Sequence, residues 1–543
     1  MSAVPSPTAD AWAPLRRPIY RGLLLCQFAS NVGTWMQVVG AQWLMGDLTS
    51  SVTAVALVQT AVTLPVFLAV LPAGALGDLL DRRVLLIASQ GGMAVVAAIL
   101  ALMTEGGMMT PWLLLSLTFL LGMGQAVVVP SWHAIQPELV PREEIPQAVT
   151  LHGVNVNFAR AVGPAIGGLV IAAVGPAAVF GLNALSFGFS VIALARWKRV
   201  KVEQRFATEG FLRAMRAGGA YVRATPPMRI LLMRLGAFMV FASALWTLLP
   251  IVARDRLDLS STGYGLLLAA AGIGAATGVV TLPPLRRRFS TNAIIGLSSG
   301  AFGIGLLVLG LSHSVVPDVV VLPVLGLAWV ATLSSMMAAA QSMLPAWSRA
   351  RGLSWYVVVV MGGQAGGSIL WGLVAEHPSL TFALVLTGAG LVGNSISGRW
   401  LPVNWLNVDL EVSQHWPQDD LDEELPDDAG PFHVRVRYAV QPGAAAQFRK
   451  AMEPVSRQRR RTGATRWVLR EDPQTPGMFI ESWYVPLWID HQRQHRERTT
   501  MRDREIEEAA LAFLVPGTEP AIERVLAEPP RRLGLLRRRA RAS

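Results

Sequence analysis

The stretch that decides the fold is Gly-Ala-Leu-Gly-Asp-Leu-Leu-Asp-Arg-Arg, at residues 74–83. It ends one apolar run at 52–76 and precedes another at 84–104. A helix needs about 20 mostly apolar residues to cross a bilayer, so each run predicts a membrane-spanning helix. The charged stretch then forms the short loop between two spans, which predicts an all-α membrane protein.

Apolar runs of this kind recur along the chain. They lie near 20–45, 52–76, 84–104, 111–133, 148–173, 177–197, 228–252, 262–283, 292–312, 317–340, 353–374 and 379–398. The sequence therefore predicts twelve transmembrane helices, and the division between the fifth and sixth, at Gly175-Pro176, is the least distinct.

The composition supports a membrane protein. Only 15% of the 543 residues are charged, against about a quarter in soluble proteins. The net charge of +11 could indicate nucleic-acid binding, but most basic residues lie in short loops between apolar runs, so no nucleic-acid partner is predicted. The single cysteine, Cys26, excludes a disulfide framework and disfavours a thiolate metal site. No metal and no other cofactor are predicted.

Basic residues gather on one side of the predicted spans, which is the cytoplasmic side in membrane proteins. With the N-terminus inside, the cytoplasmic loops contain Arg82, Arg83, Arg142, Arg196, Arg286, Arg287, Arg349 and Arg351. The opposite loops lack Lys and Arg except for Arg254 and Arg256. Both termini are therefore predicted to be cytoplasmic, with residues 1–18 as an N-terminal tail and not a signal peptide.

The spans form two related halves. Residues 278–287 end span eight with two arginines placed as in 74–83, and Gly-Pro-Ala-Ile-Gly-Gly at 163–168 aligns with Gly-Gly-Gln-Ala-Gly-Gly at 362–367. Such a repeat predicts a duplicated six-helix unit. The predicted parts are a first half at 19–200, a cytoplasmic connector at 201–227 and a second half at 228–400.

A third motif lies at the end of the fourth predicted span and in the loop after it. Residues 130–144 read Pro-Ser-Trp-His-Ala-Ile-Gln-Pro-Glu-Leu-Val-Pro-Arg-Glu-Glu. With the two motifs above, residues 15–400 resemble the major facilitator superfamily and, within it, the transmembrane secretion effector branch, which includes enterobactin-exporter-like proteins. The resemblance implies two six-helix halves in a bacterial inner membrane. It also implies secondary active efflux by proton antiport and alternating access, without catalytic residues. The substrate would be a small organic compound such as a siderophore, a drug (hence multidrug resistance) or a secondary metabolite.

The loop motif implies a conformational gate. Span two runs from outside to inside, so Asp78 lies at the cytoplasmic end, where span eleven begins near Gly352. A carboxylate at a helix N-terminus is favoured by roughly 0.3–1 kcal/mol. Asp78 at the N-terminus of span eleven would therefore hold the two halves together on the cytoplasmic side. The alternative is that these charges only set topology. The predicted gate residues are Gly74, Gly77, Asp78, Arg82 and Arg83.

Span five carries the pattern Gly163, Pro164, Gly167 and Gly168. The glycines let another helix approach closely, and the proline bends the span and frees a backbone carbonyl. The resemblance associates the pattern with proton-coupled exporters, although Ala159 stands where the family has its leading glycine. Ordinary small-residue packing remains an equal alternative.

Polar side chains at bilayer depth are costly and are therefore candidates for lining a cavity. Asn31 follows Gln27 by four residues and Arg160 follows Asn157 by three, so each pair shares a helix face. In the fold that the resemblance implies, spans one, four, seven and ten surround the cavity. The predicted substrate-cavity residues are Gln27, Asn31, Gln125, Asn155, Asn157, Arg160, Trp246, Tyr356 and Gln364.

Proton coupling needs an acid, yet no carboxylate lies in mid-span. Asp47, Asp318 and Glu376 are near predicted outer ends, and Asp78 is near an inner end. Either one of these residues carries the proton, or an anionic substrate bound at Arg160 supplies the negative charge. We favour the second hypothesis.

The C-terminal part differs in composition. Residues 401–430 are acidic and predict a linker. Strand patterns at 432–440, 465–471 and 478–484 alternate with helical patterns at 443–459 and 487–514. This order predicts a small cytoplasmic α+β ferredoxin-like domain at 431–526, followed by a basic tail at 527–543. The domain resembles dimeric antibiotic-biosynthesis-monooxygenase-like domains, which implies dimerisation through it.

Two histidines and two arginine-rich stretches in the C-terminal part each allow more than one interpretation. His491 and His495 are four residues apart, but no third metal ligand is evident, so an exposed polar face is predicted. The arginines at 457–461 and 531–541 contact anionic lipid or simply solvate the protein. Two other functions stay open for the whole chain: an enzyme, if the domain acts on the transported compound, or an importer of the same fold.

Overall fold

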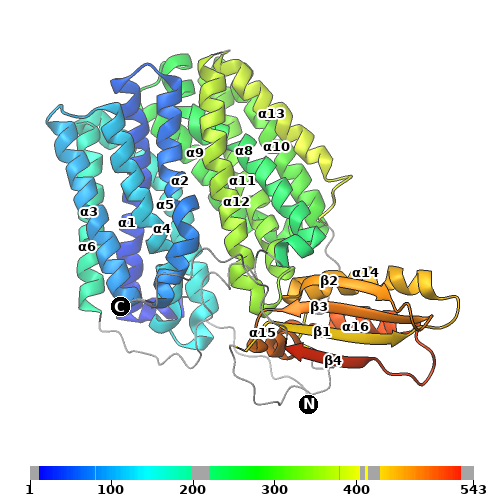
Figure 1. Cartoon of the computed structure of the whole chain (residues 1–543). Coiled ribbons are helices and arrows are strands. Elements are labelled where there is room, and N and C mark those ends of the chain that lie inside the picture. The colour runs from blue at the N-terminus through cyan, green and yellow to red at the C-terminus, as the bar shows by residue number, and fades with distance from the viewer. Residues whose placement is uncertain are drawn as a thin grey trace, which may run out of the picture. The chain divides into compact units, whose positions relative to one another are not determined.

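The computed structural model describes residues 12–79, 81–197, 219, 221–377, 379–403, 410–413 and 429–526. The chain divides into two units (Figure 1). The helical unit comprises Met1–Thr208, Ile230–Ala339 and Ser354–Val403, and the sheet unit comprises Glu209–Arg229, Ala340–Leu353 and Asn404–Ser543. Most of the predicted connector (201–227), most of the acidic linker (401–430) and the whole basic tail (527–543) lie outside the described residues.

Long helices follow one another in the helical unit, one within each predicted apolar run. They are α1 (Pro18–Leu48), α2 (Val52–Leu79), α3 (Arg82–Glu105), α4 (Pro111–Leu139), α5 (Ile145–Val174), α6 (Pro176–Arg196), α8 (Pro226–Ile251), α9 (Ser261–Arg288), α10 (Thr291–Leu311), α11 (Val315–Ser342), α12 (Arg349–Glu376) and α13 (Leu380–Ser397). The predicted break between the fifth and sixth is confirmed, because Gly175 has a φ of 91° and Pro176 begins α6.

Most of these helices suit a membrane. Among the described residues, ten are long and apolar enough to cross one, and α9 is an eleventh if its two parts, bent by 51°, count as one span. Pro283 accounts for the bend, since a proline ring clashes with the carbonyl four residues earlier, where α9 breaks. The remaining helix, α1, carries the buried amides of Gln27, Gln37 and Gln42. The prediction of twelve crossings is thus supported for ten or eleven helices.

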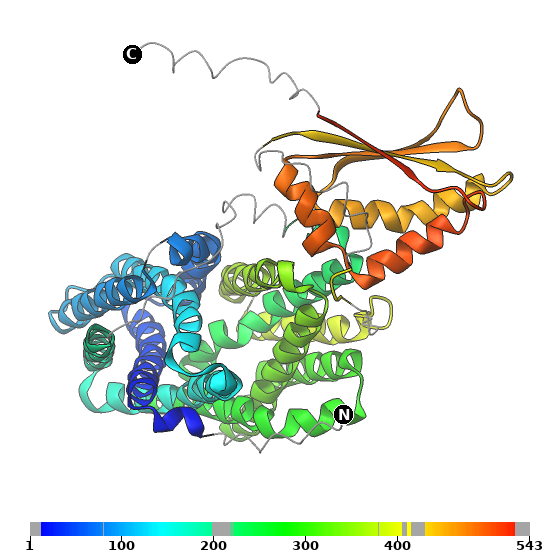
Figure 2. The ribbon, with the colours of Figure 1, turned by 90° about the horizontal axis from the view of Figure 1, so that it is seen from below.

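The two halves of the helical unit each have their own packing. In the first half, α1 packs against α5 and α6, while α2 packs against α4 and α3 against α6. In the second half, α10 packs against α13. The halves meet along α5 and α9, and Figure 2 shows the two groups of helices side by side.

The sheet unit contains four antiparallel strands in the order β2-β3-β1-β4. The strands are β1 (Phe432–Ala439), β2 (Thr465–Glu471), β3 (Met478–Val485) and β4 (Ala521–Leu526). Side chains of β1 and β3 alternate between buried and partly exposed positions, as expected for a sheet with one covered face. The helices α14 (Ala445–Thr462) and α16 (Met501–Leu511) lie on that face (Figure 2).

The predicted first three strands and first helix of this unit are confirmed within a few residues. The prediction of one helix over 487–514 is wrong. The segment forms α15 (Trp488–Arg493), a π-helical turn and α16, because Thr500 starts a new helix with a capping box to Asp503. The strand β4 was not predicted, since its six residues include two charged ones and give a weak pattern.

The prediction that His491 and His495 form an exposed polar face is also wrong. Both side chains are buried, their ring centroids lie 4.7 Å apart, and His491 packs against Trp488. Burial lowers the pKa of His491 to about 3. Among the described residues no three His, Cys, Asp or Glu side chains gather as a metal site would require.

A buried charge cluster holds the sheet to α14. The carboxylate of Glu481, on β3, accepts hydrogen bonds from Tyr438 Oη (2.7 Å), Trp467 Nε1 (2.7 Å) and Arg459 Nε (3.3 Å). Arg459 Nη1 also donates to Glu507 at 2.7 Å. Glu481 is fully buried, so removing it would leave Arg459 with less compensation for its own desolvation.

We expect Glu481→Ala to destabilise the sheet unit by about 3–5 kcal/mol, the usual cost of breaking a buried ion pair. The measurement is hydrogen exchange of the β1 and β3 amides in the full-length protein in detergent. Glu523→Ala is the matched control, because Glu523 is about half exposed and lies 4.0 Å from Arg435. Equal protection in the two variants would contradict the assignment.

Candidate functional site

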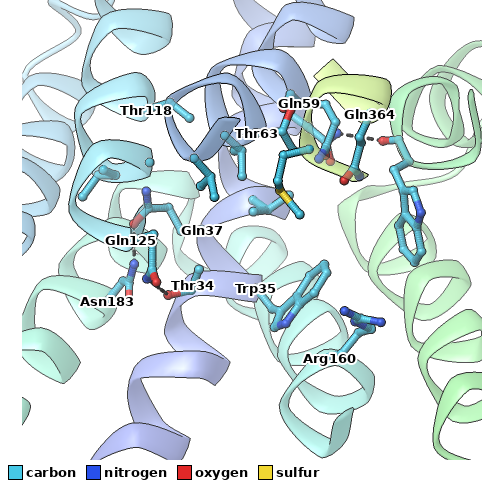
Figure 3. A pocket seen from close by; sticks show the side chains of 18 of the residues that line it. Thr34, Trp35, Gln37, Gln59, Thr63, Thr118, Gln125, Arg160, Asn183 and Gln364 are labelled. Carbon is cyan, nitrogen blue, oxygen red and sulfur yellow. Dashed lines mark hydrogen bonds between the residues drawn. The ribbon is translucent and has the colours of Figure 1, made fainter. Parts of the chain in front are cut away.

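A cavity of about 300 Å³ lies inside the helical unit, between its two halves (Figure 3). The first, fourth, seventh and tenth long helices, which are α1, α4, α8 and α11, all contribute to its wall. The polar residues that line it are Thr34, Gln37, Gln42, Gln59, Thr63, Thr118, Gln125, Arg160, Asn183 and Gln364. The cavity therefore combines apolar walls with amides, hydroxyls and one cation.

Arg160, on α5, is the one charged residue of this lining among the described residues. Its Cζ lies 5.1 Å from the ring centroid of Trp35, and Figure 3 shows the two side chains together. Its buried Nε has no hydrogen-bond partner. A cation–π contact contributes roughly 0.5–2 kcal/mol, which does not compensate for a buried charge. Arg160 is therefore the group best placed to bind an anion.

Three indoles from both halves form an aromatic wall. The ring of Trp246, on α8, lies 6.3 Å from that of Trp35 and 5.5 Å from that of Trp329, on α11. Trp246 Nε1 is buried without a hydrogen-bond partner. An aromatic surface with free donors suits a ligand that is itself partly aromatic and carries acceptors.

Amides line the side of the cavity away from Arg160, as Figure 3 shows for Gln37, Gln125 and Asn183. Asn183 Nδ2, on α6, donates to Gln37 Oε1, on α1. Toward the other half, Gln42 Nε2 donates to the carbonyl of Trp246 at 2.9 Å, and Gln42 Oε1 accepts from Tyr264 Oη at 2.5 Å. These bonds fix the amides of α1 and connect them to α6, α8 and α9.

Of the nine predicted cavity residues, four line this cavity: Gln125, Arg160, Trp246 and Gln364. The others lie elsewhere. Gln27 donates to Asn31 at 3.1 Å, Asn31 donates to Asn155 at 3.0 Å, and Asn155 donates to a carbonyl of α1 at 2.9 Å. This chain of amides joins α1 to α5.

The remaining two predicted residues bond to backbone. Asn157 Nδ2 donates to the carbonyl of Gly153 at 2.9 Å, and Tyr356 Oη donates to that of Leu333 at 2.9 Å. Several lining residues were not predicted: Gln42, Gln59, Thr63, Thr118, Asn183 and Trp329. Gln59 and Thr63 could have been found, because they are four residues apart and share a face of the apolar α2.

The two predicted gate arginines lie at the ends of other helices. Arg83 donates to the carbonyls of Leu194 (2.8 Å) and Ala195 (2.6 Å) at the end of α6. Arg82 pairs with Glu138 of α4 at 3.5 Å. Gly74 and Gly77 lie within α2, and the surroundings of these glycines and the side chain of Asp78 are outside what the structure describes. The contact of Asp78 with the start of span eleven stays a prediction.

Polar contacts join the halves at the opposite, predicted outer end. Glu376, at the end of α12, accepts from the backbone N–H of Thr53 (2.9 Å) and from Ser51 Oγ (3.0 Å), at the start of α2. Asp47, at the end of α1, pairs with Arg254 at 2.8 Å. A carboxylate of one half thus sits at a helix N-terminus of the other, which is the interaction predicted for Asp78 at the inner end.

The span-five motif places α5 between two helices. A Cβ added to Gly163 would lie 2.6 Å from Trp35 Cβ, and one added to Gly167 would lie 2.9 Å from Met36 Cα, both on α1. A Cβ added to Gly168 would lie 2.5 Å from the carbonyl oxygen of Ser261, on α9. The glycines therefore permit close contact both within the first half and between the halves.

The corresponding glycines of α12 show the same division. Gly363 and Gly367 face α8, where added Cβ atoms would meet Met239 and Val240, while Gly362 faces Phe67 of α2. Gly363 and Gly367 therefore take the places of Gly163 and Gly167. The sequence alignment of 163–168 with 362–367 is out of register by one residue.

The chain matches the family model described as "Transmembrane secretion effector" over residues 9–531. The chain belongs to the transmembrane secretion effector family. The matched range includes the whole of the described sheet unit, so this unit belongs to the family pattern.

Curated relatives agree with the family. The chain is 27% identical over 390 residues to the enterobactin exporter EntS of Escherichia coli O1:K1 / APEC, covering 69% of this chain and 91% of the relative. EntS of Shigella boydii serotype 18 is 28% identical over 391 residues, with the same coverage. Almost all of each relative is used by the match, so these relatives leave little length for a counterpart of the sheet unit.

Solved structures support the fold of the helical unit. A bacterial homologue of the human lysosomal transporter Spinster, inward-facing and unoccupied, matches with a TM-score of 0.54 and 14% identity, over 74% of this chain and 100% of that chain. The nucleoside transporter NupG matches with a TM-score of 0.60 and 11% identity, over 71% of this chain and 99% of that chain. Together with the family match and the curated relatives, this fold makes the protein a multi-pass membrane transporter of the major facilitator type.

We expect Gly168→Leu to destabilise the closed outer end by about 1–3 kcal/mol, since the added side chain overpacks the α5–α9 contact. Outward-open molecules should become about 5- to 150-fold more populated relative to closed ones. In a Cys26→Ser background, the measurement is the rate at which an impermeant maleimide labels Val38→Cys from outside.

Gly153→Leu is the control on the same helix, because no atom lies within 4 Å of a Cβ added there. A labelling rate for Gly168→Leu no higher than that of this control would mean that the glycine contact does not hold the outer end closed.

Proposed function

We propose that this protein exports a small organic anion, with siderophores as the first substrate class, through twelve transmembrane helices with both termini in the cytoplasm. The observation that carries the proposal is Arg160, a partly buried cation whose Nε is buried without a partner, in a cavity without carboxylates among its described lining residues. The relatives named as enterobactin exporters support the substrate class. The aromatic wall suits the rings of such ligands.

Alternating access between the two halves is the proposed mechanism. The outer contacts form from groups at helix ends, and they join α2 to α12 and α1 to the segment after α8. Breaking them and parting α5 from α9 would open the cavity outward. The cytoplasmic gate proposed for Gly74, Gly77 and Asp78, with Arg82 and Arg83 beside it, would close the inner end in that state.

Proton antiport is the proposed source of energy. The sequence favoured the substrate's own negative charge over a carboxylate of the protein, but the burial of Asp318 now makes this residue the proposed acid. Of the carboxylates near the outer end, Asp47 and Glu376 are engaged by Arg254 and by the start of α2. Asp318 is fully buried in the first turn of α11, and neither oxygen accepts a hydrogen bond of normal geometry from a described residue. An acidic side chain buried without a partner in a membrane span is a default candidate for a proton relay. The charged or titratable side chains that act on it are Arg256 and His313.

The sheet unit is proposed to be a ferredoxin-like domain, on the strength of its strand order and of the helices on one face. A cavity of about 320 Å³ lies beside Tyr438, Arg459 and Glu507. A second candidate function is that this domain binds the transported compound, or oxidises it with dioxygen as the electron acceptor. Oxidation of candidate siderophores by the full-length protein would establish it. Dimerisation through the domain is a further proposal, tested by the mass of the detergent-solubilised protein.

We expect Arg160→Ala to abolish export while the protein still reaches the membrane, because the cavity loses its cation. The measurement is uptake of a labelled catecholate siderophore by everted vesicles. Arg160→Lys should retain part of the transport, since it keeps the charge without the fork of donors. Asn157→Ala, one turn earlier on α5 and outside the cavity, should transport normally.

Full transport by Arg160→Ala would refute the assignment. Uptake by intact cells, with none by everted vesicles, would identify an importer in place of an exporter.

We expect Asp318→Asn to lose accumulation driven by a proton gradient but to keep exchange of labelled for unlabelled substrate, because exchange needs binding and conformational change without net proton transfer. The two assays on the same reconstituted protein separate coupling from binding. If gradient-driven accumulation persists, another group carries the proton.

A further inference from the structure

A second cavity, of about 660 Å³, lies in the sheet unit and is lined by arginines. Arg457 and Arg460 come from α14 and Arg466 from β2, while Arg223 and Arg229 flank the start of α8. The other lining residues are Ala224, Pro226, Ala464 and Trp467. Among the described residues no carboxylate contributes to this lining, so the site, here called the arginine cavity, carries a high density of positive charge.

Several other arginines of the sheet unit have acidic partners. Arg449 pairs with Glu471 at 2.9 Å, and Arg435 and Arg437 lie within 4.0 Å of Glu523. In the part of the chain that the structure describes, no ion pair involves any of the five arginines of the cavity. Gathering like charges costs free energy, which a bound anion would offset.

The backbone at Arg466 is unusual. Its φ is 52°, and the register of β2 against β3 shifts between Thr465 and Val468. Positive φ is uncommon for residues other than glycine and gathers at functional sites. The irregularity takes Arg466 out of the regular ladder at the position where it lines the arginine cavity.

The opposite wall begins a candidate membrane span. Pro226–Arg256 is long and apolar enough to cross a membrane, and Arg229 lies in its first turn. The chain therefore places this wall at the level of the lipid headgroups on the predicted cytoplasmic side. Tyr221 fixes the wall to the domain, because Arg461 Cζ lies 5.6 Å from its ring centroid and its Oη donates to the carbonyl of Met343 at 2.8 Å.

We propose that the arginine cavity binds the phosphate of an anionic phospholipid of the cytoplasmic leaflet. Guanidinium groups match phosphate with paired donors, and arginines on both walls can direct such donors at one phosphate. A free phosphorylated solute has the same chemistry, but the position of Arg229 at the start of a span favours the lipid. The bound phosphate would join α14 and β2 to the start of α8.

The test uses the full-length protein, delipidated in an uncharged detergent, with binding of a fluorescent phosphatidylglycerol measured by anisotropy. Each arginine near an anionic surface contributes about 1 kcal/mol, so Arg460→Gln with Arg466→Gln should raise the Kd by about 25-fold. Arg223→Gln with Arg457→Gln, from both walls, should have a similar effect. Arg435→Gln with Arg437→Gln removes the same charge elsewhere and should change the Kd less than about twofold.

Competition distinguishes the sources of phosphate. Unlabelled phosphatidylglycerol should displace the probe, whereas phosphatidylcholine and glycerol 3-phosphate should not. Displacement by glycerol 3-phosphate at equal concentration would refute the assignment of a lipid and would indicate a soluble phosphorylated ligand. An unchanged Kd in both cavity variants, or an equal loss in the Arg435 and Arg437 control, would overturn the site itself. Native-like hydrogen exchange in β1 confirms that each variant is folded.

Discussion

The helical unit depends on one contact, the packing of the α5 backbone on the α9 backbone. A Cβ on Gly168 would lie 2.5 Å from Ser261 O, and one on Gly265 would lie 2.5 Å from Pro164 O. Each half buries its own interior. Among the described glycines, only those of α5 and α9, the glycine seam, lie this close to a backbone atom of a helix in the other half. The cavity exists because the halves meet there and along α1, α2, α8 and α12, leaving space between.

Magnitudes indicate which contacts hold the outer end closed. The ion pair of Asp47 and Arg254 involves side chains 45% and 37% exposed, and exposed pairs contribute about 0.2–1 kcal/mol. The Glu376 carboxylate at the start of α2 contributes about 0.3–1 kcal/mol. Close helix packing over many atoms exceeds these values. The charged groups therefore set the register of the closed end, while the glycine seam supplies most of its stability.

Sequence reasoning predicted the periodic features well. Apolar runs located each long helix that the structure describes in the helical unit, because length and hydropathy are local properties. Glycine spacing marked α5 as a helix that another helix approaches closely, but it did not tell that this helix joins the halves. The sequence analysis assigned Gln27, Asn31 and Asn155 to the cavity because a polar side chain at bilayer depth costs free energy and therefore needs a partner. The sequence does not show which neighbour forms the hydrogen bond. These amides satisfy one another across α1 and α5. His491 shows the same limit in the sheet unit, since a four-residue spacing defines a face but not what covers it.

The register of the repeat shows why a motif cannot be transferred by sequence alone. Gly163 and Gly167 correspond in packing to Gly363 and Gly367. The alignment of the two motifs by residue type alone differs from this correspondence by one residue. Pro164 has no counterpart in α12, whose interior lacks proline. The two halves have therefore kept their small-residue contacts while diverging in the residues between them.

The placement of Arg160 has a consequence for the cargo. Arg160, the cation among the described lining residues, belongs to the first half, whereas the indoles of Trp246 and Trp329 belong to the second half. If an anion binds at Arg160 as proposed, a molecule with an acidic end and a ring would bind with its charge toward α5 and its ring extending from Trp35 toward Trp246 and Trp329. During transport such a molecule would translate without tumbling, and compounds with charges at both ends would fit poorly.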